Sequence, residues 1–275
     1  ASAIALAGAT PIFVDVNEQF TIDDTKIEAA ITNKTKAIMP VHLTGRPANM
    51  DKINKIAATH NLLVIEDAAQ AIGASYKNKK VGSIGNVGCF SLHPLKNLSA
   101  GGDAGMITTN DKKMYHYLLA ARNHGLKNRD ECEFWSINSR LDTMQAALLN
   151  VKITHLDKWN NRRRAIAHKY QKALKNYVLV PTDDETYHAV YHTFIIQTKQ
   201  RDDLQKYLAE HKIGAKVHYP IPIHLQEAAH YLGNKKGDFP ITEKQTAQIL
   251  SLPIYPELTD GQVDYVIQNI IDFFK

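Results

Sequence analysis

Short apolar runs alternate with amphipathic segments over the N-terminal half of the chain. Each apolar run is bounded by polar or turn residues, which is typical of buried strands; the predicted strands are 11–16, 36–43, 62–67, 87–92 and 106–109. Between them the apolar positions recur at helical spacing; the predicted helices are 1–6, one that begins at Thr21, 50–60, 111–123 and 139–151. Strands that alternate with helices of this length predict an α/β fold with a mostly parallel, doubly wound sheet.

The pattern changes after a long polar helix predicted at 154–177. Beyond this helix a short strand is predicted at 191–198 and a helix at 201–211. A long helix of this kind often connects two domains. We therefore expect a large α/β domain over residues 1–160 and a smaller α+β domain over residues 161–275.

Composition limits the class of protein. Apolar residues make up 44% of the 275 residues, enough to bury a sizeable core. The net charge of +5 suits anionic small molecules, whereas scattered basic residues argue against nucleic acid. The densest basic cluster, Arg162-Arg163-Arg164, is interpreted as a solvated helix face.

Cysteine usage and hydropathy indicate a cellular compartment and argue against a metal site. The two cysteines, Cys89 and Cys132, lack metal-ligand spacing, so we expect no metal site. Such sparse usage fits a reducing cytoplasm. No apolar run reaches transmembrane length and no cleavable signal is recognisable, so we expect no membrane association.

The candidate chemistry lies where predicted strands end. Lys96 follows a strand and precedes a glycine-rich run, and Asp67 ends another strand, with Gln70 shortly after it. Ligands bind at the carboxyl ends of parallel strands. A lysine at such a turn, partly desolvated, is suited to form a Schiff base. Lysine with a strand-end aspartate is the pair that pyridoxal phosphate (PLP) chemistry requires.

Each of these residues also has an ordinary explanation. Taken alone, Lys96 is a loop lysine, Asp67 is a helix cap or a solvated carboxylate, and Gln70 is a surface amide. Ser91, at the end of the strand before the lysine, is a turn serine or a hydroxyl that donates to a phosphate. The chain has neither a dinucleotide fingerprint nor a P-loop, which weakens a nucleotide-cofactor interpretation.

A series of ordered motifs resembles the DegT-type family of PLP-dependent sugar aminotransferases, which have the fold-type I architecture. The matches extend along essentially the whole chain and are specific in sequence. They are the runs 37–51, 65–71 (IEDAAQA), 91–97 (SLHPLKN), 102–105 (GDAG), 122–125 (RNHG), 138–147, 159–164 and 218–226 (HYPIPIHLQ).

The resemblance implies roles for the residues that match. Lys96 is then the lysine that binds the cofactor covalently and moves a proton, and Asp67 is the carboxylate beside the pyridine nitrogen. Four further positions match cofactor or substrate contacts. Gln70 matches a residue near the cofactor's 3-hydroxyl, Ser91 matches a phosphate contact, and His218 and Tyr219 match a sugar-substrate loop.

The resemblance also implies partners and a reaction. Asn138 matches an asparagine that reaches the phosphate of the neighbouring subunit's cofactor, so we expect a homodimer with shared active sites. His124 is a substrate contact or an ordinary loop residue. The expected reaction moves an amino group from an amino acid, glutamate, to a keto group of a nucleotide-linked deoxysugar for polysaccharide or other amino-sugar biosynthesis. Two stretches, 128–135 and 218–226, resemble members that act on 3-keto sugars.

Three alternatives remain open at this point. The chain begins with Ala1 in what resembles the middle of a helix, so we expect an N-terminally truncated chain, and an inactive fragment is one alternative. A non-catalytic regulatory or structural protein of the PLP fold is another. A cysteine desulfurase is disfavoured because Cys132 stands among acidic residues that raise a thiol pKa. Related sugar dehydratases carry histidine in place of the lysine, so Lys96 favours transamination.

Overall fold

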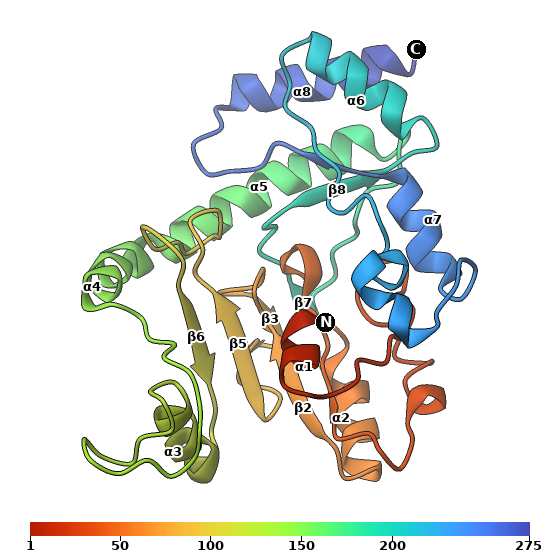
Figure 1. Ribbon diagram of the computed structural model, residues 1–275. Coiled ribbons are helices and arrows are strands. Elements are labelled where there is room, and N and C mark those ends of the chain that lie inside the picture. The colour runs from red at the N-terminus through yellow and green to blue at the C-terminus, as the bar shows by residue number, and fades with distance from the viewer. The chain divides into compact units, whose positions relative to one another are not determined.

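The computed structural model describes residues 1–275 and divides them into two compact units. Each unit is built from segments that are far apart in sequence. Unit 1 comprises 1–36, 166–182 and 193–275, and unit 2 comprises 37–165 and 183–192. The helix α5 (Leu156–Leu174) contributes residues to both units (Figure 1). The boundary expected at residue 161 stays a prediction.

The main sheet of unit 2 has four strands in the order β1-β2-β5-β6 (Figure 1). The strands are β1 (Ala37–Ile38), β2 (Leu63–Asp67), β5 (Val87–Ser91) and β6 (Gly105–Thr108). The first three are parallel, and β6 is antiparallel to β5. The mostly parallel α/β sheet predicted from the hydrophobic pattern is therefore confirmed.

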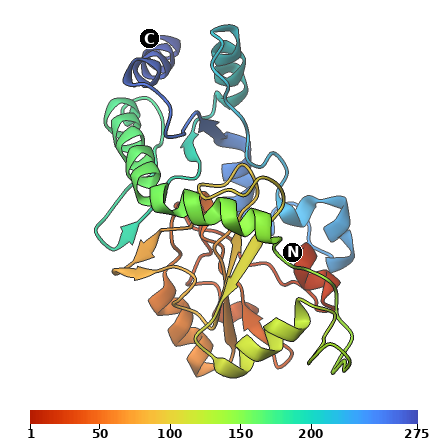
Figure 2. The same cartoon turned by 90° about the vertical axis from the view of Figure 1, so that its left-hand side faces the viewer.

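Helices flank this sheet. They are α2 (Met50–Thr59), α3 (Lys112–Ala121) and α4 (Thr143–Lys152), with short 3-10 turns η2 (Leu43–Gly45) and η3 (Ile153–His155). In Figure 2, α2 (orange) and α3 (yellow-green) lie on opposite sides of the strands. Helix α2 buries Met50, Ile53 and Ala57 on one face. Helix α3 begins where the Asp111 carboxylate accepts the backbone N–H groups of the first turn.

A second, antiparallel sheet in unit 2 has the order β4-β3-β7. Its strands are β3 (Ser75–Tyr76), β4 (Lys79–Lys80) and β7 (Tyr187–His188). The pairing of β3 with β7 joins residues 183–192 to the rest of the unit.

Unit 1 is built on the antiparallel pair β8 (Phe194–Gln197) and β9 (Ile249–Leu252), in which every residue is buried. Around it the unit has α1 (Ser2–Leu6), α6 (Arg201–Glu210), α7 (Pro240–Gln248) and α8 (Asp260–Phe273), with the 3-10 turns η1 (Glu28–Ala30), η4 (Ile223–Leu225) and η5 (Glu227–Leu232). Unit 1 therefore has α+β content, and the smaller domain expected over residues 161–275 stays a prediction. None of the helices combines the length and apolar character that crossing a membrane requires.

Two elements predicted near the N-terminus are wrong. The strand predicted at 11–16 is reduced to one bridge between Val16 and Ile22. The Val16 N–H donates to the Asp15 side chain at 2.9 Å and is therefore not available for a hydrogen bond to a neighbouring strand. The helix predicted from Thr21 contains only η1, because the Asp23 carboxylate accepts the Thr25 N–H at 3.1 Å and favours a turn over a helix.

The strand predicted at 36–43 is shorter than expected. Only Ala37 and Ile38 form a ladder, since Pro40 has no N–H to donate. The chain nevertheless stays beside β2, because the Pro40 carbonyl accepts the Asp67 N–H at 2.9 Å and Val41 forms a bridge with Asp67. This contact brings the segment after β1 to the carboxyl end of β2.

Candidate active site

Asp67 stands at the carboxyl end of β2, in register with Cys89 of β5. Its backbone is held on both sides, because its N–H donates to the Pro40 carbonyl and its own carbonyl accepts the His42 N–H at 3.0 Å. One carboxylate oxygen accepts the Ala69 N–H at 3.1 Å. The side chain is half-buried, so the carboxylate is oriented but still accessible to a ligand.

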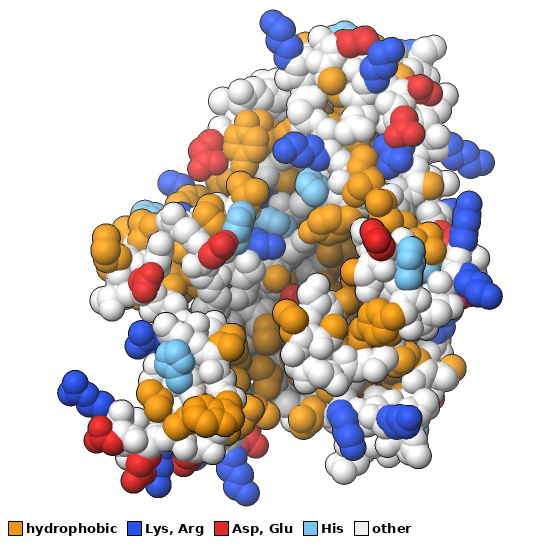
Figure 3. Space-filling view, viewed as in Figure 1, with side chains coloured by type: hydrophobic (Ala, Val, Ile, Leu, Met, Phe, Trp, Pro, Cys, Tyr) orange, Lys and Arg blue, Asp and Glu red, His pale blue; other side chains and the backbone are white.

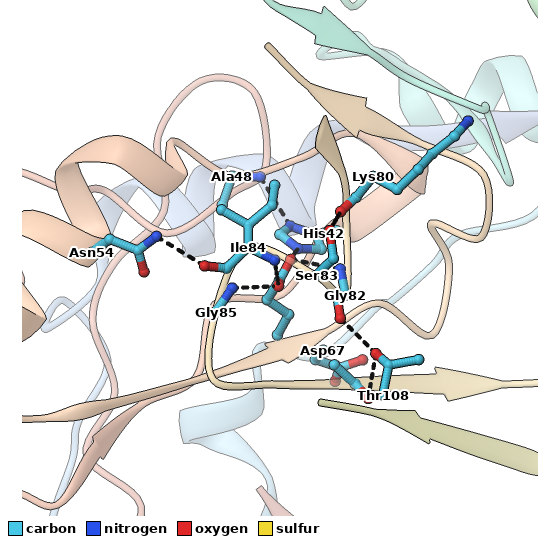
Figure 4. A network of polar contacts seen from close by, with 12 residues as sticks. His42, Ala48, Asn54, Asp67, Lys80, Gly82, Ser83, Ile84, Gly85 and Thr108 are labelled. Atoms are coloured by element: carbon cyan, nitrogen blue, oxygen red, sulfur yellow. Dashed lines mark hydrogen bonds and ion pairs between the residues drawn. The ribbon is translucent and has the colours of Figure 1, made fainter. Parts of the chain in front are cut away.

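A fully buried hydrogen-bond network that contains the Glu66 carboxylate lies one residue earlier in β2. Glu66 and His42 both have 0% exposure, and the His42 Nε2–H donates to the Glu66 carboxylate at 3.0 Å. The His42 Nδ1 accepts the Ala48 N–H, which fixes the hydrogen on Nε2. The carboxylate also accepts three backbone N–H groups, those of Gly82, Ile84 and Gly85 (Figure 4).

Burial raises the pKa of Glu66, but the His42 hydrogen bond and the backbone N–H groups outweigh it and hold the pKa below its usual value. The Glu66 carboxylate therefore joins the segment after β1 and the 82–85 loop to β2, one residue before Asp67. The hydrophobic pattern and the motifs alone do not reveal the pairing of Glu66 with His42. Its signal was available as a glutamate within an apolar strand and a histidine that follows another.

Lys96 lies on a closed turn directly after β5. The backbone N–H of Lys96 donates to the His93 carbonyl at 2.8 Å, and the Ala100 N–H returns to the Leu92 carbonyl at 2.8 Å. The side chain is half-buried, and this burial lowers the pKa of the Lys96 amine, while the negative charge of Asp67 acts in the opposite direction. The Lys96 amine therefore lies within electrostatic reach of the Asp67 carboxylate.

Gln70 and Ser91 border the same end of the sheet. The Gln70 side-chain oxygen accepts the Thr44 N–H at 2.7 Å, which leaves its amide nitrogen as the donor for a ligand. Thr44 has a φ of 63° within the tight turn η2, so this contact depends on an unusual backbone. Ser91 is the last residue of β5, and its Oγ accepts the His93 N–H at 3.4 Å.

His124 and Asn138 lie beside each other on a different part of unit 2. The residues Asn123 and Asn138 form a bridge, and the His124 N–H donates to the Ile137 carbonyl at 3.0 Å. Both side chains are exposed, and the Asn138 oxygen accepts from Arg140 at 2.9 Å. This loop between α3 and α4 therefore carries both residues at the surface.

Apolar side chains surround that loop. Figure 3 shows hydrophobic atoms gathered over α3 and the segment after it. The exposed large side chains there are Tyr115, Tyr117, Leu119, Trp135, Ile137 and Met144. Trp135 is 94% exposed and Met144 is 86% exposed, which is unusual for residues of this kind on a monomer.

His218 and Tyr219 belong to unit 1. The His218 Nδ1 lies 3.0 Å from the Ser251 hydroxyl, and burial together with the charge of Lys216 lowers the pKa of His218. Tyr219 is 58% exposed. The histidine is therefore fixed within its unit, and the neighbouring phenol is accessible to a ligand.

The interpretation of Arg162 to Arg164 as a solvated face is wrong for two of the three residues. Arg163 is 8% exposed and donates to the carbonyls of Tyr191 and His192, and Arg164 donates to the Ala189 carbonyl at 2.7 Å. These arginines hold residues 189–192 against α5. No group of three or more His, Cys, Asp or Glu side chains is placed to hold a metal ion.

Comparison with known proteins gives a family match over residues 1–271, to the DegT/DnrJ/EryC1/StrS aminotransferase family. A pleiotropic regulatory protein of Geobacillus stearothermophilus is 45% identical over 280 residues, covering 100% of this chain and 75% of that protein. A dTDP-3-amino-3,6-dideoxy-α-D-galactopyranose transaminase of Aneurinibacillus thermoaerophilus is 45% identical over 271 residues, covering 98% and 74%.

Among solved structures, DesV of S. venezuelae in complex with a ketimine intermediate superposes with a TM-score of 0.97. It is 38% identical, and the match covers 100% of this chain and 75% of that chain. The likeness therefore extends over both units and is accompanied by substantial sequence identity.

Proposed function

Since this chain belongs to the DegT/DnrJ/EryC1/StrS aminotransferase family, we propose that it transfers an amino group from glutamate to a keto group of a nucleotide-linked deoxysugar. The observation that carries the proposal is the half-buried Lys96 amine beside the strand-end carboxylate of Asp67. Relatives support the substrate class, since one is named as a transaminase of a dTDP-linked 3-amino sugar. That name favours a 3-keto sugar as the acceptor.

The residues at the carboxyl ends of β2 and β5 fit PLP, the cofactor of this family. The Lys96 amine would bind the cofactor's aldehyde carbon, and the Asp67 carboxylate would hold a proton on its ring nitrogen. Gln70 would donate to the 3-oxygen and Ser91 would donate to the phosphate. When bound, PLP supplies an electron sink for the carbon that loses its proton.

The protein's own groups then account for proton movement. Lys96, once released from the cofactor, would act as the base that removes the donor's α-proton and as the acid that delivers a proton to the cofactor's former aldehyde carbon. Burial lowers the pKa of the Lys96 amine, which increases the fraction of neutral amine at a given pH. Asp67 is fixed by the Ala69 N–H and by its backbone contacts, so its charge stays aligned while the proton moves.

Substrate contacts and assembly extend the proposal. His218 and Tyr219 would contact the sugar, and His124 would contact the substrate from the loop after α3. Asn138 would reach the cofactor phosphate of a second copy, which makes the active sites shared in a homodimer. The exposed apolar side chains around Asn138 support this assembly. Two unpaired cysteines are consistent with a cytoplasmic location, which we include in the proposal.

A regulatory role without catalysis is the second candidate, because one relative is named a pleiotropic regulatory protein. The two functions give different spectra. An enzyme mixed with PLP develops a visible absorbance band that is lost when glutamate is added. A protein without catalytic function leaves the spectrum unchanged after glutamate.

The decisive experiment is borohydride reduction of the PLP-treated protein, followed by peptide mapping. We expect the label on Lys96, and we expect the folded variant Lys96→Ala to lose both the label and turnover. Lys79→Ala, a change at an exposed lysine of β4, is the matched control and should keep both. A label on another residue, or turnover by Lys96→Ala, would overturn the proposal.

A further inference from the structure

Asn97 follows Lys96 directly and is 6% exposed. Its amide nitrogen donates to the Asn160 side-chain oxygen at 2.9 Å and to the Val190 carbonyl at 3.1 Å. Its side-chain oxygen lies 3.2 Å from the His192 Nδ1. An amide oxygen can only accept, so the His192 Nδ1 carries the hydrogen. The residue after the lysine is thus bonded through both ends of its carboxamide.

Asn160 carries the network to a second turn. It lies on α5, is 3% exposed, and donates its amide nitrogen to the Ile72 carbonyl at 3.1 Å. Gly73 permits this approach, since a Cβ there would meet the Asn160 nitrogen at 2.6 Å. Main-chain carbonyls thereby fix the orientation of both carboxamides. Ile72 lies two residues after Gln70, so α5 connects the glutamine turn to the lysine turn.

Val190, which accepts from Asn97, connects the network to the turn that orients Gln70. The Val190 N–H donates to the Gly45 carbonyl at 3.0 Å, and Gly45 follows Thr44, whose N–H donates to the Gln70 side chain. A Cβ on Gly45 would lie 2.8 Å from the Val190 side chain, so this packing is tight. The segments bearing Lys96, Gln70 and Thr44 are therefore joined through two buried carboxamides.

We infer that Asn97 and Asn160 are positioning residues that hold the Lys96 turn in the orientation from which its amine attacks the cofactor's aldehyde. The inference rests on the role of Lys96 in the proposed function. Rotation of the Lys96–Asn97 peptide would break the buried hydrogen bonds of the Asn97 side chain. Burial makes each lost hydrogen bond costly. A rigid support of this kind is needed because small misplacements of a reacting group slow a reaction strongly.

Two variants and one control test the inference. Asn97→Ala and Asn160→Ala each remove one carboxamide from the network. Asn54→Ala removes a carboxamide of the same kind elsewhere in unit 2, where it donates to the Ile84 carbonyl at 3.2 Å. For each protein, urea unfolding measures stability, so that a general loss of stability is separated from an effect on the lysine.

The first readout uses no cofactor. Acetylation of Lys96 by acetic anhydride, followed by mass spectrometry over a neutral-to-alkaline pH series, reports how the amine ionises. We expect its midpoint to move to higher pH in Asn97→Ala and Asn160→Ala, because a loosened turn admits water to the amine. The midpoint in Asn54→Ala should equal that of the unchanged protein.

The second readout is the rate at which the protein captures PLP covalently. We expect this rate to fall about 10-fold to 100-fold in the two network variants and to stay unchanged in Asn54→Ala. Wild-type midpoints and capture rates in both folded network variants would overturn the inference. If either alanine variant fails to fold, Asn97→Ser and His192→Phe remove fewer contacts and are judged by the same measurements.

The two proposals fail in distinguishable ways. If the unchanged protein captures PLP on another residue, the role of Lys96 is wrong, whereas the acetylation series still reports on the turn. If capture occurs on Lys96 but the network variants match the unchanged protein, only the positioning role is wrong.

Discussion

Burial and charge act on the Lys96 amine in opposite directions. Burial lowers the pKa of Lys96 and the Asp67 carboxylate raises it, and burial prevails. We predict that Asp67→Asn lowers the pKa of Lys96 further in the cofactor-free protein, because the charge is lost while the burial remains. The pH dependence of Lys96 acetylation measures this pKa, and its midpoint should move to lower pH.

The matched control for that prediction is Asp103→Asn. Asp103 lies on the same loop as Lys96, but its side chain is 95% exposed, so solvent screens its charge. Its replacement should leave the midpoint where it is. A midpoint that moves to higher pH in Asp67→Asn would contradict the electrostatic account of the site.

The carboxylate of Glu66 is predicted to matter for stability more than any exposed acid. Glu66→Gln keeps the size of the side chain but turns an amide nitrogen toward hydrogen-bond donors in a site with 0% exposure. We expect the free energy of unfolding to fall by about 2–3 kcal/mol, as for other buried groups left without partners. Urea unfolding at neutral pH measures it. The exposed Glu18→Gln is the control, and equal stabilities would exclude the anchoring role.

The sign of the pH dependence follows from the direction of the shift. The folded state holds the pKa of Glu66 below its usual value, so its contribution to stability is complete above that usual value. This contribution is lost as the pH falls toward and through the folded pKa. As the pH is lowered, the free energy of unfolding should therefore fall less steeply in Glu66→Gln than in the unchanged protein.

Helix α7 begins on a carboxylate from the opposite end of the chain. Asp15 is 3% exposed and accepts the backbone N–H groups of Ile241 and Thr242 at 3.1 and 2.9 Å. Burial raises the pKa of Asp15, but the Thr242 side-chain and backbone bonds outweigh it and lower the pKa from 3.8 to about 2. The N-terminal segment of unit 1 is thus fixed to α7.

We predict that Asp15→Ala destabilises the protein by about 2 kcal/mol near neutral pH, from the lost cap and the lost charge. The contribution of the charge is present above pH 3.8 and disappears as the pH falls toward 2. Thermal or urea unfolding over an acid-to-neutral series measures it. Asp203→Ala, an exposed carboxylate in the first turn of α6, should cost much less; equal losses would argue against a cap.

The elements themselves show where sequence patterns suffice. Helix α2 and strands β2 and β5 were predicted closely, because their apolar positions follow one period and their ends carry ordinary turn residues. The strand predicted at 11–16 is wrong because Asp15 bonds residues 226 and 227 positions away, which no local pattern reveals. Pro40 shortens β1, although the sequence itself contained that signal.

The candidate site was predictable for the same reason. Asp67 and Ser91 end two parallel strands and Lys96 follows the second, so their common edge follows from the fold. The supporting carboxamides were not predictable, because Asn97 and Asn160 act through contacts that join distant segments. A buried amide in a loop or helix has no distinctive spacing and resembles a surface residue until the fold is known.

At the scale of the whole molecule, the family match over residues 1–271 spans both units, and the exposed surface bears on assembly. The apolar face around the loop after α3 predicts a second copy as its partner, since Trp135 and Ile137 are 94% and 70% exposed. Trp135→Glu together with Ile137→Glu should weaken dimerisation about 100-fold or more, as for central interface residues. Sedimentation measures this, with Leu6→Glu, an exposed leucine of unit 1, as the control.

A shared active site makes a stricter prediction than dimerisation alone. If Asn138 serves the partner's cofactor, the Lys96→Ala and Asn138→Ala changes of a mixed dimer fall in the same active site. One site of that dimer then carries both changes and the other carries neither. Random exchange of the two inactive variants should therefore restore about a quarter of the activity per subunit, because half of the dimers are mixed and each has one intact site. A mixture that remains inactive although mass spectrometry shows mixed dimers would place Asn138 in its own subunit's site.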